Sequence, residues 1–169
     1  MTDIPTPAPG NSLSQRELFV TQWQTGLRIR HMAHNMCYSR YSSRNRLIGL
    51  TATVLSALVS TAVIVSFSKS GNISLQVCAG AFSILATLFA AANTFLKYGE
   101  LATKHEQAAA AFGALRRGLE LSESWDGELT KDVMTDIMNK WDQLEKTAPD
   151  IPTRVYDAAE ESVTGKKIR

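Results

Sequence analysis

The chain has 169 residues, and its 18 Lys and Arg nearly balance its 16 Asp and Glu, so the formal net charge is only +2. This length corresponds to one domain, and two cysteines are too few for a disulfide scaffold. The charges are unevenly distributed, because fourteen of the sixteen acidic residues lie at Glu100 or later and none lies between Glu17 and Glu100. The intervening segment is strongly apolar, which argues against both a disordered chain and an ordinary soluble globule.

The N-terminal part of the chain predicts a short lead followed by one long helix. Residues 1–13 contain three of the five prolines and predict a disordered lead. Ser14 and Glu17, three residues apart, resemble a capping box, which marks a helix start. No proline interrupts the following segment, so we expect one helix over residues 14–68, with Gly26 as its weak point.

Two long segments without charge predict two membrane spans. Residues 47–68 and 70–96 contain no charged side chain, and each is as long as the roughly 20 residues that a helix needs to cross a bilayer core. A buried hairpin in a soluble bundle is the alternative, but its helices would carry charges on at least one face. We therefore expect transmembrane helices over 47–68 and 73–96, joined by an extracytoplasmic turn at 69–72.

Basic residues set the expected orientation of this hairpin. The turn carries only Lys69, whereas many more basic residues flank the two open ends: Arg28, Arg30, Arg40, Arg44, Arg46, Lys97, Lys104, Arg116 and Arg117. The positive-inside rule then puts both termini in the cytoplasm. We expect Tyr41 and Tyr98 near the inner headgroups. Arg40, Arg44 and Arg46 either contact anionic headgroups or pair with Glu100.

Beyond the second span the pattern stays helical. Apolar residues recur at three and four positions over 97–124, which predicts that the second span continues into a cytoplasmic stalk helix, matching the stalk helix expected over 14–46. Within 125–163 we expect one helix over about 128–146, a rigid turn that contains Pro149 and Pro152, and a short amphipathic helix over 153–163. A basic tail is expected over 164–169. The predicted fold is an all-α membrane protein, a two-transmembrane helical hairpin with cytoplasmic stalk helices and C-terminal helices, assembled as an oligomer.

One face of the second span carries small and polar residues at helical spacing: Gln76, Gly80, Ser83, Thr87, Ala91 and Thr94. The first span has a shorter stripe of the same kind: Gly49, Thr53, Ser56 and Ser60. Such stripes let transmembrane helices approach closely, either within the hairpin or in a dimer. The alternative is that the stripe of the second span lines a pore in an oligomer. Gln76 favours polar surroundings, since its amide is costly to bury without a partner.

Four arginines of the stalk form the second candidate site: Arg28, Arg30, Arg116 and Arg117. At about 1.5 Å per residue, Arg28 and Arg116 lie at similar distances from their span ends. Guanidinium groups bind phosphates with two hydrogen bonds, so these residues are candidates for a nucleotide or oligonucleotide site. The alternatives are solvent-exposed charges, or ion pairs with Glu120 and Glu123.

The remaining reactive side chains do not predict a catalytic or metal centre. His34 and His105 lie at about 18 Å and about 12 Å from their span ends, so we expect hydrogen bonding within the stalk and no zinc site. Cys37 and Cys78 are expected to be free thiols. The sequence has no phosphate-binding glycine loop and no nucleophile elbow, so we expect neither an enzyme nor a cofactor.

The order of several motifs around the hairpin resembles a known family. They are Trp23, Arg28, His31, Tyr38, Arg40 and Asn45 before the spans, Ala102, His105, Ala109, Phe112, Leu115, Arg116 and Leu119 after them, and finally Pro149-Asp150-Ile151-Pro152. This pattern, which covers about Leu18 to Val163, resembles the SLATT family, the two-transmembrane effector domain associated with SMODS nucleotidyltransferases and SLOG sensors.

The resemblance implies a bacterial effector of anti-phage defence in the inner membrane. It implies a homo-oligomeric ion channel or pore among membrane lipids. Its opening is expected to be controlled by a nucleotide or oligonucleotide made by a partner nucleotidyltransferase, and to cause depolarisation and growth arrest. Two alternatives remain: a non-conducting membrane scaffold that recruits a cytoplasmic partner enzyme, and a bilayer-disrupting protein without selectivity. Neither the sign of control nor the number of subunits follows from the sequence.

Overall fold

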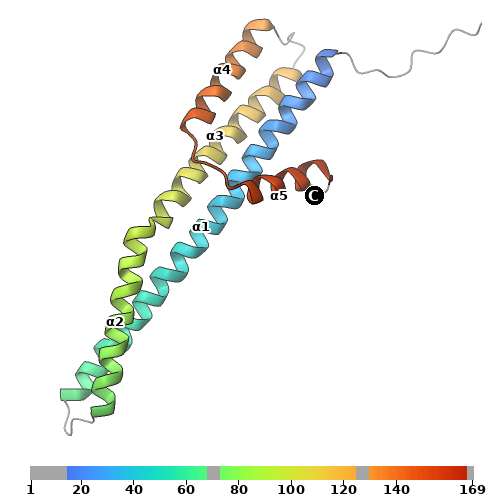
Figure 1. Cartoon of the computed structure of the whole chain (residues 1–169). Helices are drawn as coiled ribbons and strands as arrows, with labels where there is room; N and C mark the ends of the chain where they lie inside the picture. Colours follow the sequence, from blue (N-terminus) through green and yellow to red (C-terminus); the bar gives the residue numbers. More distant parts are fainter. Residues whose placement is uncertain (1–14, 68–72, 125–129, 167–169) are drawn as a thin grey trace, which may run out of the picture. The chain divides into compact units, whose positions relative to one another are not determined.

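The computed structural model describes residues 15–67, 73–124 and 130–166, so the predicted lead, the turn and the end of the basic tail lie outside the described residues. The described residues form five helices, labelled in Figure 1: α1 (Gln15–Phe67), α2 (Ile73–Leu96), α3 (Tyr98–Ser124), α4 (Lys131–Thr147) and α5 (Thr153–Thr164). None of these residues forms a strand. The all-α prediction is confirmed.

Helix α1 runs through its 53 residues without a break. Gly26, which was proposed as a weak point, lies inside this helix and allows α4 to pack closely against it. A Cβ atom at this position would lie 2.8 Å from Cη2 of Trp141 on α4, so only glycine lets that ring approach. The absence of proline explains the continuity of the helix.

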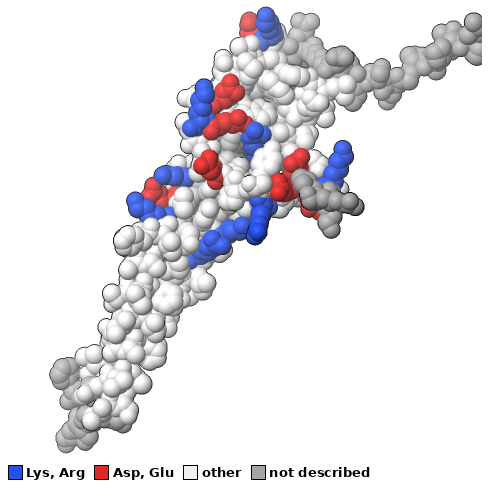
Figure 2. Space-filling view, viewed as in Figure 1, with Lys and Arg blue, Asp and Glu red and all other residues white. Residues whose placement is uncertain are grey.

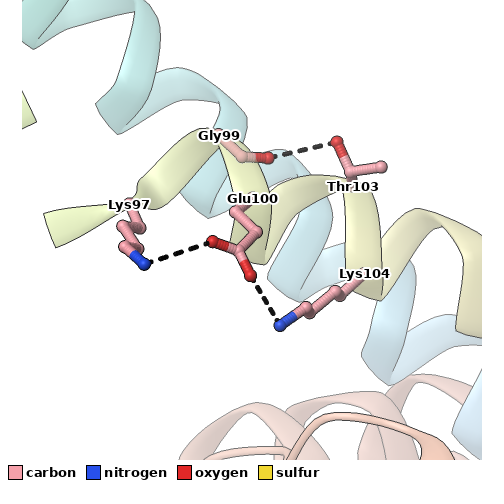
Figure 3. Close-up of polar contacts among 5 residues, drawn as sticks. All are labelled: Lys97, Gly99, Glu100, Thr103 and Lys104. Carbon is pink, nitrogen blue, oxygen red and sulfur yellow. Dashed lines mark hydrogen bonds and ion pairs between the residues drawn. The ribbon is translucent and has the colours of Figure 1, made fainter. Parts of the chain in front are cut away.

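The second span is followed by a stalk helix, and a one-residue break separates the two. Helix α2 ends at Leu96, α3 begins at Tyr98, and Lys97 between them has a φ of 46°. Glu100, in the first turn of α3, pairs with Lys104 at 2.7 Å and with Lys97 at 3.8 Å (Figure 3). A carboxylate there is favourable, because the first turn of a helix presents unpaired N–H groups.

A neighbouring glycine explains why α3 can begin close to α1. A Cβ atom at Gly99 would lie 3.3 Å from Oδ1 of Asn45. The carbonyl of Gly99 also accepts a hydrogen bond from the Thr103 hydroxyl at 3.1 Å (Figure 3). No simple sequence pattern marks the break at Lys97, since non-glycine residues rarely adopt a positive φ.

The contacts divide the chain into two compact units. The first unit contains α1 up to Ala33, α3 from Ala110, α4, and the chain from Pro152 through α5. Its buried apolar side chains are Val20, Leu27, Ile29, Ala33, Phe112, Leu119, Ile137, Val155 and Ala159. All four helices therefore contribute to one small core.

The second unit, His34–Ala109 with Ala148–Ile151, contains the rest of α1, all of α2 and the start of α3. Its buried side chains gather where α1 and α3 meet: His34, Cys37, Ala102, His105, Ala108 and Ala109. Along the two spans the helices touch only through one face each. The half-buried positions are spaced by three and four residues, as in Ile48, Ala52, Leu55, Val59 and Ala62 of α1.

The spans expose large apolar side chains over most of their surface. The most apolar 18-residue window has a mean hydropathy of 2.1 in the first helix and 1.6 in the second. No residue of these two windows is buried. Leu50, Ile64 and Ile84 are each more than 60% exposed, and Figure 2 shows no charge on this part of the surface. The helices of a soluble bundle would bury these side chains against other helices, whereas lipid leaves them favourably placed.

The two C-terminal helices are close to their expected positions. Helix α4 was expected from about residue 128 but begins at Lys131, where the Val133 N–H lies 3.4 Å from the Thr130 hydroxyl that caps it. Helix α5 follows Pro152, as predicted, and ends at Gly165, which has a φ of 69°. Glycine is the usual residue at this left-handed helix end.

Candidate functional site

The polar stripe of α2 lies away from the contact within the hairpin. All six of its residues are exposed. The half-buried positions of α2 form a different face: Ala79, Ala86, Phe89, Ala92 and Asn93. Packing within one hairpin therefore does not account for the stripe, which leaves contact with other copies of the chain, with lipid, or with water in a pore.

The hydroxyl groups of both stripes donate to their own helices. Thr87 donates to the Ser83 carbonyl at 2.9 Å and Thr94 to the Ala90 carbonyl at 3.2 Å. In α1, Thr53 and Ser56 do the same at 2.9 Å. This bonding satisfies the O–H donors without water and leaves the oxygen lone pairs facing outwards. Such a surface tolerates lipid and also offers acceptors to water or to a cation.

One polar group in the hairpin contact had not been singled out from the sequence. The Oδ1 atom of Asn93 is buried and accepts no hydrogen bond from the residues that the structure describes. Asn93 follows two alanines and precedes Thr94, so nothing in the local pattern distinguishes it from the polar stripe. An orphaned carbonyl oxygen at this depth is costly, which favours a water molecule or another copy of the chain nearby.

Among the stalk arginines, Arg30 is already engaged. It forms an ion pair with Glu145 of α4, and its guanidinium lies 5.1 Å from the centre of the Trp141 ring. The indole N–H of Trp141 donates to the same Glu145 carboxylate at 2.6 Å. Trp23 completes the cluster, with its ring edge-on to Trp141 at 5.8 Å. Arg30 therefore holds α1 to α4, and its charge is matched.

Arg116 and Arg117 of α3 lie near His31 of α1. A Cβ atom at Gly113 would be 3.2 Å from Nε2 of His31 and 3.5 Å from Nη1 of Arg117, so both nitrogens lie near one point. Burial, Arg116 and Arg117 all lower the pKa of His31. Arg116 approaches Glu120 at 3.5 Å, so one of the ion pairs considered from the sequence is present.

Arg28 is exposed, and its position follows from the register of the two helices. His31 and Gly113 are neighbours on antiparallel helices. Position 28 precedes His31 by three residues and position 116 follows Gly113 by three, so these two positions lie at the same level. Glu123, the other carboxylate considered as an arginine partner, accepts a hydrogen bond from Gln24. Arg28, Arg116 and Arg117 thus belong to one level of the first unit.

The second unit contains a buried pair of histidines. His34 and His105 are only 2% and 1% exposed, and their Nδ1 atoms lie 2.9 Å apart. One ring must donate and the other accept, so the two rings have different tautomers. Tyr41 stacks on His105 at 5.4 Å and on Tyr98 at 5.9 Å.

The expectation of hydrogen bonding within the stalk is thus confirmed for His34 and His105, although the height estimate placed them apart. The contacts of Gly99 with Asn45 and of Gly113 with His31 agree with that estimate, which treated Arg46 and Lys97 as level. A mismatch of about one turn is bridged by side chains on facing helices. The structure describes no group of three or more His, Cys, Asp or Glu that is suited to a metal ion.

The other basic residues near the inner ends of the spans have aromatic or acidic neighbours. The Arg44 guanidinium lies 5.8 Å from the centre of the Tyr98 ring. Glu100 was considered as a partner for the arginines of α1, but it pairs instead with Lys97 and Lys104. Its hydrogen bond with Lys104 lowers the pKa of Glu100. Both cysteines are free; Cys37 is buried, which raises its pKa, and Cys78 is exposed.

A groove between α3 and α4 was not anticipated from the sequence. Its volume is about 530 Å³. The small residues of α3 leave space for the groove, and α4 contributes both apolar and polar residues to its lining. The lining includes Ala111, Ala114, Gly118, Val133, Ile137 and Lys140. The spacing of Ala111, Ala114 and Gly118 marks one face of α3, but the partner helix could not be inferred from that spacing alone.

With this geometry established, comparison with protein families identifies the chain. The family described as SMODS and SLOG-associating 2TM effector domain family 4 matches residues 29–163. The chain belongs to this SLATT family. No curated protein and no solved structure matches it.

The SLATT match extends over both spans, the histidine pair and most of the two units. It confirms the resemblance drawn from the motifs, and with the two exposed apolar helices it identifies a membrane protein, an effector in a defence context. Three of the four candidate arginines lie within the matched residues, whereas Arg28 precedes them by one position. The groove between α3 and α4 also lies within the matched part of the chain.

Proposed function

We propose that this SLATT protein is a homo-oligomeric ion channel of the bacterial inner membrane, with both termini in the cytoplasm. A nucleotide or oligonucleotide signal, made by a partner nucleotidyltransferase, controls its opening. The open channel depolarises the infected cell and arrests its growth. The protein performs no catalysis of its own, and its permeant species are ions. The family's association with SMODS and SLOG supports the link to a nucleotide signal.

The observation that supports the channel most strongly is the exposed polar stripe of α2. A single hairpin cannot enclose water, so a conducting path requires several copies arranged around an axis. In that assembly, one helix face from each copy lines the path, and the rest faces lipid or neighbouring helices. The stripe is the face best suited to the path, because its side chains are small, weakly polar and unused within the hairpin.

The oxygen lone pairs of Ser83 and Thr87 give this face its chemistry. Their helix positions place both on the stripe, and the Thr87 O–H is already bonded to the Ser83 carbonyl. The outward oxygens then act as acceptors, which favours partly hydrated cations over anions. The stripe contains no charged residue, so selectivity of this kind is weak.

The experiment is current recording from purified protein in a planar bilayer, with and without candidate nucleotides and short oligonucleotides. Unitary current steps are expected for the natural chain. The double variant Ser83→Leu with Thr87→Leu should insert and assemble normally, but we expect its conductance to fall at least tenfold because leucines exclude water from the path.

A matched control places similar bulk on another exposed face of the same helix. Ala81→Leu with Leu88→Phe should leave the unitary conductance within about twofold, since neither position lies on the stripe. Normal conductance in the Ser83–Thr87 variant, or equal loss in both variants, would remove the stripe from the pore.

The groove between α3 and α4 favours one second candidate function, a non-conducting scaffold that recruits a partner enzyme. Val133 lines the groove and is 38% exposed, so Val133→Glu should block docking without unfolding the helix. Loss of growth arrest in this variant, with a silent bilayer for the natural chain, supports the scaffold. A bilayer-disrupting protein would instead release large dyes together with ions.

A further inference from the structure

Three nitrogen-bearing side chains of the first unit come together near Gly113: His31 of α1 and Arg117 of α3 lie close to Gly113, and Arg116 of α3 is near enough to His31 to lower its pKa. Gly113 is buried and has no side chain, which is what allows His31 to approach α3. Because His31 Nε2 and Arg117 Nη1 both lie close to one point, a single small group can reach both. The arrangement brings donors from two helices together.

Charge around this cluster is not balanced by carboxylates. Among the described residues, Arg117 has no carboxylate partner. Arg116 has only Glu120, whose side chain is 47% exposed. The contact is 3.5 Å long, and the buried Nε of Arg116 makes no hydrogen bond. An exposed ion pair of this kind contributes little, whereas a buried donor without an acceptor is costly.

Arg30 provides the contrast within the same unit. Its guanidinium has both a carboxylate partner, Glu145, and an aromatic ring, Trp141. A structural arginine in this stalk is therefore fully matched, and Arg116 and Arg117 are not. The unmatched positive charge calls for an anion.

We propose that His31, Arg116 and Arg117 form one oxyanion site that binds a phosphate group, with His31 taking up a proton as the phosphate binds. Guanidinium groups suit phosphate because their N–H donors match two of its oxygens. Protonated imidazole adds a further charged donor. Identifying this phosphate with that of the control signal rests on the proposed function, but phosphate binding itself does not.

The proton is the distinctive part of the proposal. Burial and the two arginines lower the pKa of His31 in the empty site, so its ring is neutral near pH 7. A bound dianion attracts the proton, raises this pKa, and so binds more tightly as the pH falls. The charged groups that act on His31 are Arg116 and Arg117 on α3. On its own helix, Arg30 precedes it by one position and is already paired with Glu145 of α4, and Arg28 precedes it by three positions.

The position of the site favours a soluble phosphate over a lipid headgroup. His31 lies sixteen residues before the first span, Leu47 onwards. That separation is about 24 Å along helix α1 at 1.5 Å per residue, which is beyond the headgroup region. Vesicles or nanodiscs made with anionic and with zwitterionic lipid separate the two sources, because a headgroup in the site would compete with added anion.

The test uses the full chain in lipid nanodiscs and follows histidine ring signals by NMR. Sulfate is the first probe, because it stays a dianion throughout the pH range and cannot itself take up the proton; inorganic phosphate is the second. We expect saturating sulfate to raise the pKa of His31 by about one unit, and sulfate to bind about three- to fivefold more tightly at about pH 6 than at about pH 8. His105, in the other unit, should not respond.

Three variants and a control make the assignment specific. His31→Gln should bind sulfate with no pH dependence, and Arg117→Gln should weaken binding at least tenfold. Gly113→Ala places a Cβ 3.2 Å from the His31 ring, so it should weaken binding while helix content is unchanged. Arg154→Gln removes an exposed arginine of α5 and should have no effect.

Each outcome decides something about the site or about the channel. An unshifted His31, or equal losses in Arg117→Gln and Arg154→Gln, overturns the oxyanion site whether or not the protein conducts. If anionic lipid competes with sulfate for the site, the proposal that the bound phosphate comes from a soluble molecule is overturned. Sulfate binding with the expected pH dependence in a protein that never conducts upholds the site and contradicts the channel. Nucleotide control that persists in Arg117→Gln would separate this site from the signal.

Discussion

At the scale of single residues, the His34–His105 pair shows how burial fixes protonation. A pair of neutral imidazoles shares one proton between its Nδ1 atoms. Protonating the accepting Nδ1 would set two N–H donors against each other and leave a positive charge where almost no water reaches it. The sequence supported hydrogen bonding in the stalk, but the partner of each ring depended on the alignment of two helices. Helical rise alone could not show that two side chains about one turn apart in height would meet.

The pair predicts a loss of stability in acid. Burial lowers the pKa of His105, so folding favours its neutral form, and this stabilisation is complete above the ordinary value of 6.5. It is lost as the pH falls below 6.5 towards the lowered pKa. We expect the thermal midpoint in detergent to fall between about pH 7.5 and about pH 5, as followed by circular dichroism.

Replacing both partners tests the assignment. His34→Leu with His105→Leu replaces both partners by apolar side chains and should remove the part of the acid sensitivity that the pair contributes. His31, whose pKa is also lowered, contributes a separate part, so His31→Gln should remove that part and retain the part that comes from the pair. An equal acid-induced loss in the double leucine variant would assign the effect to other groups.

At the scale of elements, most of the helices could be predicted, and the junction between α2 and α3 could not. Uncharged length identified the two spans, and the two prolines of the preceding turn marked the start of α5. The break at Lys97 depends instead on how closely α3 approaches Asn45 through Gly99, which is a contact between distant parts of the sequence. Likewise, the polar stripe followed from helical spacing, but its separation from the hairpin contact required the packed structure.

The break predicts opposite effects of glycine at two neighbouring lysines. Lys97→Gly should be neutral or stabilise the fold by up to about 1 kcal/mol, because glycine adopts a positive φ without the cost that a Cβ imposes. Lys104→Gly, inside α3, should destabilise it by about 1 kcal/mol. Thermal unfolding of the two variants in the same detergent measures the difference. Equal destabilisation would mean that Lys97 does not hold a left-handed conformation.

At the scale of the whole molecule, the chain combines two charge-free spans with a polar part that carries all its charged groups except Lys69 of the turn. The hairpin presents lipid-compatible side chains on most of its surface and a weakly polar stripe on one face of α2. The first unit presents unmatched arginines near His31. Subunit number was beyond the sequence, because one chain specifies which faces are available and not how many copies close a ring.

The most direct test of the channel is the accessibility of the stripe to water during conduction. A chain with Cys78→Ala and Thr87→Cys, recorded in a planar bilayer, receives a charged, water-soluble thiol reagent; buried Cys37 stays as it is. We predict that the unitary current falls in steps as subunits are modified, and that Leu88→Cys in the same background, exposed but off the stripe, shows no change. An unaltered current in Thr87→Cys, or the same block in Leu88→Cys, would contradict a pore lined by this face of α2.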